Sequence, residues 1–206
     1  MYEFEEKYIL EGYKHIAGTD EAGRGPLAGP VTAAAVILNP QDKIEGLNDS
    51  KQLSKKKRQL LVKEIKERAL AYAIVFVSEA VIDEINIYQA SKKAMIEALF
   101  KLPSKPDFIL SDAMPLKESN LPFEAIIKGD TLSASIAAAS ILAKEARDDY
   151  MVELAKRYPE YHFEKHKGYP TKEHIEAIHQ YGILPVHRKT YEPIKSIIFG
   201  QLSFDL

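Results

Sequence analysis

Four acidic side chains follow apolar segments at points where strands would end, and such positions can hold a divalent cation. Asp20 and Glu21 follow one apolar run, and Asp112 and Asp130 follow two others. Burial makes unpaired charges costly, and clustered carboxylates repel each other unless a cation lies among them. Mg²⁺ prefers such oxygen ligands together with water and a substrate phosphate. The pattern favours two-metal phosphodiester chemistry, although Asp130 alone would be an ordinary helix N-cap and Asp112 alone a turn residue.

A Gly/Pro-rich segment at residues 23–30 comes directly after the first acidic pair. It lacks the Lys-Ser/Thr of a Walker sequence, and its glycine spacing misses the dinucleotide fingerprint by one residue, so we reject both nucleotide loops. Small residues beside the carboxylates would let backbone groups approach a ligand closely, with Arg24 available for phosphate. An ordinary tight turn is the alternative. Adjacent strand residues point to opposite faces, so the two acidic neighbours could serve one site only if the chain kinks, as Gly23 and Gly25 would permit.

Eight basic residues lie between Lys51 and Arg68. A run of charges on a helix is usually a solvated face, and this is the interpretation that we favour for most of these lysines. Lys51 precedes the helix, in Asn-Asp-Ser-Lys at 48–51, and is the better candidate for a phosphate contact.

Five of the six histidines fall between His162 and His187. A zinc site made by His166, His174 and His179 is disfavoured, because there are no cysteines and no close His pair of the usual spacing. We expect surface or phosphate-facing imidazoles instead. Without tryptophan, stacking on sugars or bases would require tyrosine or phenylalanine, and Tyr169 lies among cations where a nucleic acid would bind.

The elements that must position these residues are indicated by hydrophobic periodicity and by Gly and Pro. Strands are expected at residues 15–19, 31–38, 71–77, 108–110 and 123–127. Helices are expected at about 54–70, 78–102, 130–158 and 171–181. The short connection between the first two strands makes them antiparallel, so we predict a mixed five-stranded α/β sheet flanked by helices. Residues from about 158 to 206 are expected to form a C-terminal helical appendage packed on that sheet.

Composition limits the class of protein. The chain has 206 residues, of which 46% are hydrophobic and 28% charged, as expected of one globular domain over residues 1–206. Lys and Arg number 28 and Asp and Glu 30, a net charge of −2, so a nucleic-acid site must be a local patch. Without cysteine, disulfides, thiolate zinc sites and cysteine nucleophiles are excluded. The acidic first residues and the short apolar runs predict a cytoplasmic chain with no membrane contact.

Six motifs, taken in order, resemble those of bacterial ribonuclease HII. They are Thr-Asp-Glu-Ala-Gly-Arg-Gly-Pro-Leu-Ala-Gly-Pro at 19–30, Asn-Asp-Ser-Lys at 48–51, Leu-Ser-Asp-Ala at 110–113, Ile-Lys-Gly-Asp at 127–130, His-Lys-Gly-Tyr at 166–169 and His-Arg at 187–188. The resemblance runs from about Asp20 to Pro193. It implies a ribonuclease H-like sheet and a type 2 ribonuclease H, an endonuclease that cuts the RNA strand of RNA/DNA hybrids and 5′ of single ribonucleotides in duplex DNA.

The resemblance also implies roles for individual residues. Those implied to hold Mg²⁺ or Mn²⁺ and to act in catalysis are Asp20, Glu21, Asp112 and Asp130. Those implied to bind substrate are Gly23, Arg24, Gly25, Lys51 and Tyr169. Water would attack in line and leave 3′-hydroxyl and 5′-phosphate ends; the Gly-Arg-Gly segment would read the ribose 2′-hydroxyl, Tyr169 would stack on the adjoining deoxyribose, and Lys51 would hold a phosphate. Ser111 is polar where we expect an apolar residue before the third carboxylate.

Two alternatives to this enzyme stay open. A non-catalytic hybrid-binding module could have the same loop and basic patch, but four carboxylates favour the enzyme, because anions oppose a phosphate. A metal-dependent exonuclease also uses four carboxylates on a ribonuclease H-like sheet. We expect the chain to act as a monomer.

The last ten residues, 197–206, are apolar and contain two aromatic rings and a glycine. Gln201-Leu202-Ser203-Phe204 resembles the short glutamine-leucine-aromatic peptides with which bacterial replication and repair proteins bind the sliding clamp. A tail that folds back on its own domain, or a disordered one, is the simpler interpretation. The hypothesis is that the tail tethers the protein to a sliding clamp without contributing to catalysis.

Overall fold

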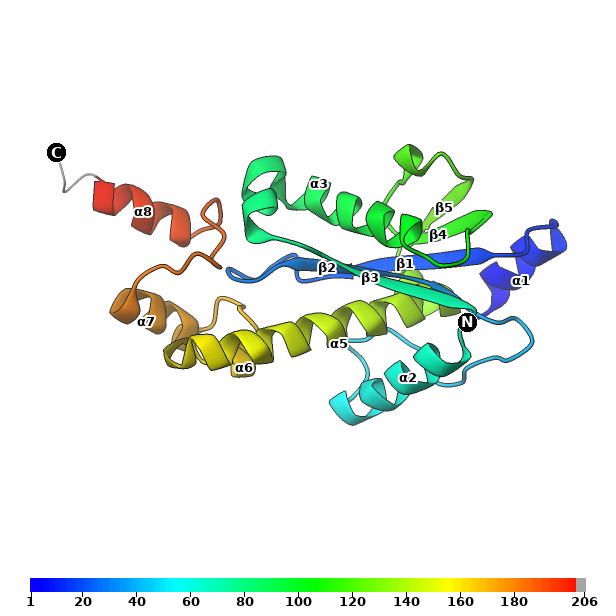
Figure 1. The fold of residues 1–206 in the computed structure, drawn as a ribbon, viewed down its shortest axis with the longest axis horizontal. Helices are drawn as coiled ribbons and strands as arrows, with labels where there is room; N and C mark the ends of the chain where they lie inside the picture. Colours follow the sequence, from blue (N-terminus) through cyan, green and yellow to red (C-terminus); the bar gives the residue numbers. More distant parts are fainter. Residues whose placement is uncertain (203–206) are drawn as a thin grey trace.

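The computed structural model of the chain describes residues 1–202, and for residues 201 and 202 only the backbone. Within this range the strands form one mixed sheet with the order β3-β2-β1-β4-β5 (Figure 1). The strands are β1 (Ile16–Ala22), β2 (Val31–Ile37), β3 (Ala71–Val77), β4 (Phe108–Asp112) and β5 (Phe123–Ile126). β2 is antiparallel to both β1 and β3, whereas β4 is parallel to β1 and β5 to β4. This topology confirms the predicted mixed five-stranded sheet.

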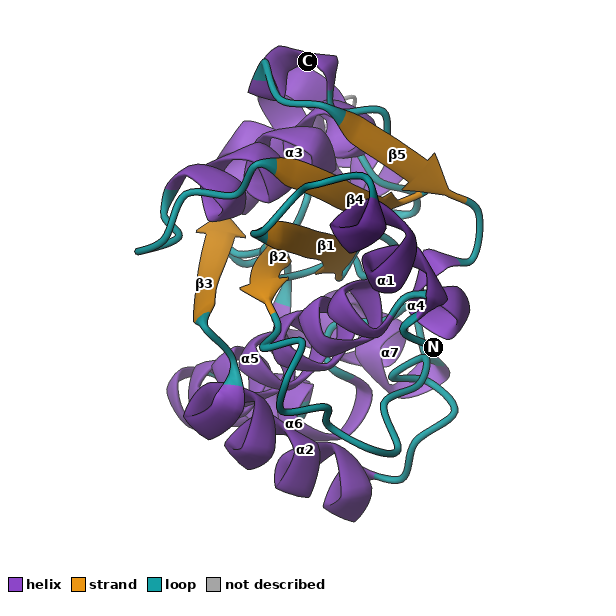
Figure 2. Ribbon diagram, turned by 90° about the vertical axis from the view of Figure 1, so that its right-hand side faces the viewer, coloured by secondary structure: helices purple, strands orange, loops and turns teal. Residues whose placement is uncertain are grey.

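Helices cover both faces of the sheet. They are α1 (Glu3–Leu10), α2 (Lys55–Arg68), α3 (Glu79–Phe100), α4 (Gly129–Leu132), α5 (Ala134–Arg157), α6 (Phe163–His166), α7 (Lys172–Tyr181) and α8 (Ile194–Leu202). α3 lies on one face, and α2 and α5 lie on the other (Figure 2). Among the helices of residues 1–202, none is both long and apolar enough to cross a membrane.

The burial pattern of the strands follows from this layering. β2 is buried at every position, because helices cover both of its faces, whereas the edge strand β3 alternates between buried and more exposed residues. The small residues of α5 let its backbone approach β1 closely. A Cβ atom at Gly18 in β1 would lie 2.1 Å from the backbone carbon of Ser135 in α5, so the close approach requires glycine there.

The long helix expected over 130–158 is interrupted, and that expectation was wrong in one respect. Ser133 has an extended backbone (φ −111°, ψ 131°) that separates α4 from α5, and its side-chain oxygen accepts a hydrogen bond from the Ile136 amide as an N-cap. The Ser133 hydroxyl also donates to Oε1 of Glu5 (2.6 Å), which accepts from the Ser135 amide as well (2.8 Å). The break places Asp130 on a separate single turn of helix.

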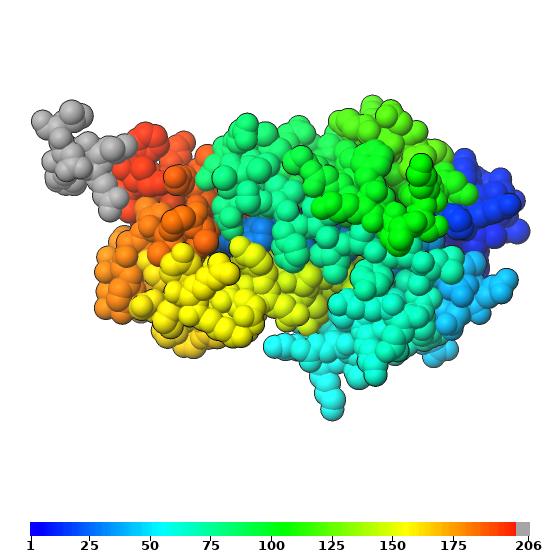
Figure 3. Space-filling view, viewed as in Figure 1, coloured from blue at the N-terminus to red at the C-terminus, as the bar shows by residue number. Residues whose placement is uncertain are grey.

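Three helices, α1, α6 and α8, lie outside the predicted set. The buried residues of α1 are Glu5 and Tyr8, so a buried carboxylate hides its hydrophobic periodicity. The C-terminal helices gather at the end of the molecule opposite to α1 (Figure 3). There they pack against the last turns of α5 and against Leu27 and Ala28, which follow β1.

Candidate active site

Three carboxylates from three elements meet at one end of the sheet. Asp20 lies in β1, Asp112 is the last residue of β4, and Asp130 lies in α4. One carboxylate oxygen from each lies within 4.8 Å of the other two. Because β1 and β4 are parallel neighbours, their carboxyl ends meet at the same edge, and the turn of α4 places Asp130 beside them. We call these three residues the carboxylate cluster.

Hydrogen bonds hold two members of the cluster. Oδ1 of Asp112 accepts from the Gly129 amide (2.8 Å), and Oδ1 of Asp20 accepts from the Glu21 amide (2.7 Å). The unexpected Ser111 is fully buried and donates to the Met114 carbonyl oxygen (2.6 Å). Its hydroxyl is therefore satisfied without contacting the cluster.

The electrostatics of the cluster oppose the presence of three negative charges. Burial, with the neighbouring charges of Glu21 and Asp112, raises the pKa of Asp20 well above its usual range. Burial, with the charges of Asp112 and Asp49, raises the pKa of Asp130 to about 6 against the lowering effect of Lys51. A cation among these oxygens would remove that repulsion.

Glu21 lies beside the carboxylate cluster but is not a member of it. The pairing of β1 with β2 is continuous from Ala17 to Ala22, so the strand does not kink at the acidic pair, and yet both residues line one cavity. Oε1 of Glu21 accepts from Arg24 (3.2 Å), whereas Oε2 is buried and has no hydrogen-bond partner among the described residues. Burial raises the pKa of Glu21 against the lowering effect of Arg24.

A cavity of about 350 Å³ lies at this edge of the sheet. Its lining residues are Asp20, Glu21, Ala22, Gly23, Arg24, Gly25, Ser50, Lys51, Asp112, Ser140, Lys144, Arg147 and Tyr169. Thus eight of the nine residues proposed from the sequence line one cavity, and the ninth, Asp130, contacts it through the carboxylate cluster. We call Gly23, Arg24, Gly25 and Tyr169 the loop wall.

Two buried arginines hold the glycine-rich segment from behind. Arg188 is 0% exposed and donates to the carbonyl oxygens of Gly23 (2.6 Å), Arg24 (2.8 Å) and Gly29 (2.8 Å). Arg147, which is 1% exposed, donates to those of Pro30, Ala28 and Lys167. These hydrogen bonds fix the backbone of the glycine-rich segment beside the cavity, which Arg147 also lines.

Gly23 is required by this arrangement. Its φ of +94° is in the left-handed region, and a Cβ atom there would lie 2.1 Å from Nε of Arg147. Gly25 differs, because a Cβ atom there would have Cε1 of Tyr169 as its nearest neighbour, at 3.5 Å.

Lys51 lies on the segment between β2 and α2 and lines the same cavity as the loop wall. Burial lowers its pKa, but the charges of Asp49, Asp130 and the other nearby carboxylates outweigh this and raise it. Arg58 anchors the segment by donating to the carbonyl oxygens of Ser50 (3.2 Å) and Leu53 (2.9 Å).

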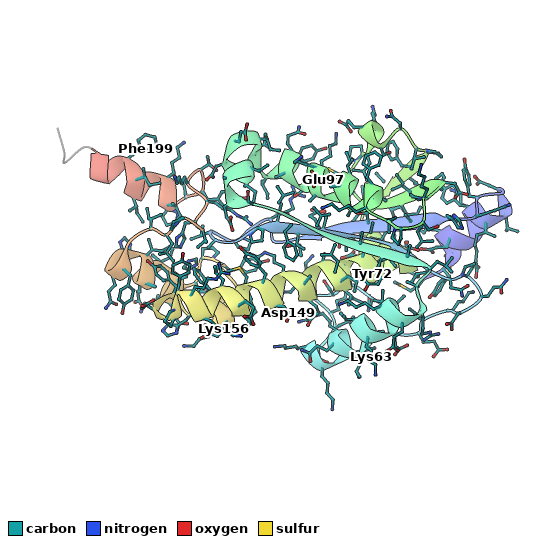
Figure 4. The ribbon with its side chains drawn as sticks, viewed as in Figure 1. Lys63, Tyr72, Glu97, Asp149, Lys156 and Phe199 are labelled. Carbon is teal, nitrogen blue, oxygen red and sulfur yellow. The ribbon has the colours of Figure 1, made fainter. Side chains whose placement is uncertain are left out.

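Most other basic residues of the 51–68 stretch are solvated, as Lys63 on α2 illustrates (Figure 4).

Comparison with known proteins identifies the family. The family model described as Ribonuclease HII matches residues 17–193. The chain belongs to the ribonuclease HII family. It is 54% identical to a ribonuclease HII of Bacillus cytotoxicus over 98% of this chain and 78% of that protein. It is also 54% identical to one of Endomicrobium trichonymphae, over 96% of this chain and 95% of that protein.

Solved structures of ribonuclease HII relatives share the fold. The ribonuclease H2 of Pyrococcus horikoshii has a TM-score of 0.76 and 28% identity, covering 89% of this chain and 97% of that one. The structure described as a PCNA:RNase HII complex from Archaeoglobus fulgidus has a TM-score of 0.74 and 26% identity, covering 87% of this chain and 96% of the matched chain. The chain is therefore a ribonuclease with the mixed sheet of this family.

Three cavity residues on α5 of this ribonuclease were not identified from the sequence. Ser140, Lys144 and Arg147 all lie on α5 and line the cavity. The Ser140 hydroxyl is hydrogen-bonded to that of Ser50 (3.0 Å), and Lys144 forms a salt bridge with Asp148 (2.5 Å). Their spacing of i, i+4 and i+7 is the signal that could have found them, because it places three polar residues on one face of a helix made mostly of small apolar ones.

The expectation of surface or phosphate-facing histidines is wrong for His166, His174 and His187. All three are buried, with at most 9% of each residue exposed. They stack in a row, with ring centroids 4.5 Å apart for His166 and His174 and 5.3 Å apart for His174 and His187. Each ring nitrogen in this row has a hydrogen-bond partner within the protein, so the row is not a metal site.

Proposed function

We propose that the chain is an endonuclease that cleaves the RNA strand of RNA/DNA hybrids and cuts 5′ of single ribonucleotides embedded in duplex DNA. The observation that carries this proposal is the cavity in which Asp20 and Asp112 share one space with the loop wall. Carboxylates alone would suit many metal-dependent hydrolases. A fixed backbone loop and an aromatic ring beside them could distinguish a ribose from a deoxyribose next to the reacting phosphate.

The carboxylate cluster fits Mg²⁺ or Mn²⁺. Three oxygens within 4.8 Å are the hard ligands that these ions prefer, and a cation would offset the burial and the repulsion by Asp112 that raise the pKa of Asp130. Glu21, with one buried oxygen lacking a partner among the described residues, would be a further ligand. When bound, two such ions would activate the attacking water and stabilise the leaving 3′-oxygen, so that the products carry 3′-hydroxyl and 5′-phosphate ends.

The chain's own side chains would bind and orient the nucleic acid. Lys51 and Arg24 are cations in the cavity lining and would hold phosphates on either side of the cluster. Gly23 and Gly25 would let the backbone approach the ribose 2′-hydroxyl, and Tyr169, which is 43% exposed, would stack on the adjoining deoxyribose.

Cleavage of a closed circular duplex tests this function. The substrate contains a single ribonucleotide and is incubated with the full chain and Mg²⁺, Mn²⁺ or a chelator. We expect a nick 5′ of the ribonucleotide with either metal and no nick with the chelator, and an all-DNA circle should stay closed. Binding without nicking would instead favour a hybrid-binding module. Degradation of linear substrates alone would favour an exonuclease.

We also propose that the C-terminal residues Gln201–Phe204 bind a sliding clamp. The Archaeoglobus fulgidus neighbour, described as a complex with PCNA, supports a clamp as partner of this chain. Ser203 and Phe204 lie outside the described residues, and the preceding helix α8 presents Phe199 with 61% exposure at the end of the molecule (Figure 4). Calorimetric titration of the full chain against the clamp should show binding that Phe204→Ala abolishes; equal binding by the variant would refute this tail as the contact.

A further inference from the structure

Tyr169 is held by a chain of hydrogen bonds that passes through two buried imidazoles. Nδ1 of His187 is 2.9 Å from the Leu184 amide nitrogen, which donates to it. Nε2 of His187 and Nε2 of His174 are 3.1 Å apart. Nδ1 of His174 lies 2.9 Å from the carbonyl oxygen of Tyr169. His174 is 0% and His187 1% exposed, so water does not share these bonds.

The two ends of this chain determine where each proton lies. A backbone amide can only donate, so Nδ1 of His187 carries no proton, and in the neutral ring Nε2 must carry it. Nε2 of His187 therefore donates to Nε2 of His174, whose single proton then lies on Nδ1 and is donated to the Tyr169 carbonyl. Starting from the carbonyl, which can only accept, gives the same assignment. Both rings are neutral at neutral pH, because burial lowers the pKa of each to about 4.

A third buried imidazole, that of His166, binds the residue before Tyr169. Nδ1 of His166 accepts from the Gly168 amide (3.2 Å), so its Nε2 donates to the Tyr161 carbonyl oxygen (2.8 Å). The Gly168–Tyr169 segment is thus bound at one amide and at one carbonyl by rings that stack on each other. The Tyr169 ring itself is 43% exposed and lines the cavity. The ring is therefore placed in part by its backbone, whose carbonyl accepts from the Thr171 amide (2.8 Å) as well as from His174.

We propose that His174, oriented by His187, is a positioning residue that places the Tyr169 ring in the cavity and thereby sets the preference for a single ribonucleotide over a long hybrid. The inference rests on the proposed ribose-reading function of Tyr169. Buried apolar side chains could fill the same volume without burying polar atoms, whereas only a group that accepts on one side and donates on the other can transmit a fixed orientation from Leu184 to Tyr169.

The tautomers are tested by ¹⁵N NMR of the histidines in the full chain, with His174→Phe and His187→Phe used for assignment. We expect the Nδ1–H tautomer for His174 and the Nε2–H tautomer for His187 at neutral pH. An Nε2–H tautomer or a cationic ring at His174 would overturn the chain of donors.

The positioning role is tested by a double-mutant cycle with Tyr169→Ala and His174→Phe. For each variant kcat and KM are measured on a duplex with one ribonucleotide and on a long hybrid. We expect His174→Phe to lower the ratio of kcat/KM for the two substrates about fivefold, and to lower it no further in the Tyr169→Ala background. His174→Asn, which keeps a donor at the Nδ1 position, should restore most of the ratio.

Phe163→Leu is the matched control for a general loss of packing. Phe163 is buried against His174 and His187 but makes no side-chain hydrogen bond, so this variant should lower Tm without changing the substrate ratio.

The double-mutant cycle can overturn the inference. It does so if His174→Phe changes the substrate ratio equally in the parent and in the Tyr169→Ala background. If Tyr169→Ala itself leaves the ratio unchanged, the ribose-reading function fails. In that case the effects of Tyr169→Ala and His174→Phe on the overall kcat/KM are compared with that of the double variant. Non-additive effects would still show that His174 acts through Tyr169, and additive effects would show that it does not.

Discussion

The carboxylate cluster and the loop wall bound the same cavity, yet they are stabilised in opposite ways. In the cluster, burial and the neighbouring carboxylates raise the pKa values of Asp20 and Asp130. Their ionised forms are therefore unfavourable in the protein alone. The loop wall is held from the interior, where Arg188 donates to the carbonyl oxygens of Gly23 and Arg24, and His174 donates to that of Tyr169. The carboxylate cluster is therefore incomplete without a cation, whereas the loop wall is organised before any ligand binds.

Substitution in the cluster should have the largest effect on activity and a favourable effect on stability. Asp112→Asn replaces a ligand by a poorer one and removes one of the repelling charges. We expect kcat to fall by at least about 10³-fold while affinity for a ribonucleotide-containing duplex is retained, and the metal-free variant should have a higher Tm than the parent. Near-normal cleavage at saturating metal would remove Asp112 from the site.

Substitution in the loop wall should instead reduce stability and activity together. Gly23→Ala forces an unfavourable φ and a clash with Arg147, so we expect about 3 kcal/mol of lost unfolding free energy and about 10²-fold lower kcat/KM. Gly25→Ala is the matched control, because its nearest neighbour is the edge of the Tyr169 ring at 3.5 Å. It should change the unfolding free energy by less than about 0.5 kcal/mol in urea titrations while still reducing cleavage. Equal destabilisation by both variants would contradict the anchoring described for this loop.

The two regions should respond to pH with opposite sign. The pKa of His174 and of His187 is lowered to about 4, so below pH 6.5 the unfolded chain binds protons that the folded chain does not, and stability falls from pH 6.5 to pH 4. The pKa of Asp130 is raised to about 6, so protonation of the folded chain adds stability as the pH falls from 6 to 4.

Urea unfolding of the metal-free chain at pH 7 and pH 4.5 separates these contributions. His174→Phe should reduce the loss of unfolding free energy on acidification, and Asp130→Asn should increase it, each by about 2 kcal/mol. If both variants change the loss of unfolding free energy on acidification in the same direction, the two regions do not respond to pH with opposite sign.

The smallest effect is expected at Lys51, which belongs to neither region. Lys51→Ala should weaken binding to all duplex substrates alike by a few fold and reduce the salt dependence by about one phosphate contact. Lys63→Ala, on the solvated face of α2, is the control and should change neither quantity. A selective loss on ribose-containing DNA with an unchanged salt slope would show that Lys51 does something other than hold a phosphate.

Local signals were enough to predict the sheet and the positions of the acidic residues. The strands are short apolar runs bounded by Gly, Pro and Asp, and the carboxylates follow them in the sequence, so their convergence follows from a parallel pairing of β1 with β4. The start of α2 was also predicted correctly, because it is fixed locally: the Ser54 side chain accepts a hydrogen bond from the Lys57 amide.

Features that depend on distant partners could not be predicted in this way. The break at Ser133 is stabilised by Glu5, which is 128 positions away, and Arg188 binds Gly23 across 165 positions. Buried histidines resemble surface ones in sequence, because the row of His166, His174 and His187 exists only once α6, α7 and the following turn pack together. Tertiary contacts decide these features, and residue type and spacing alone do not.

The span between Gly23 and Arg188 has a consequence for synthesis. The ribosome makes proteins from the N-terminus, at about 5–20 residues per second, and domains begin to order as they emerge. By the time α5 has been translated, the sheet and all three members of the carboxylate cluster exist, but the carbonyls of Gly23, Arg24 and Gly29 still lack Arg188. A nascent chain therefore contains every member of the carboxylate cluster before it contains the arginine that anchors the glycine-rich segment.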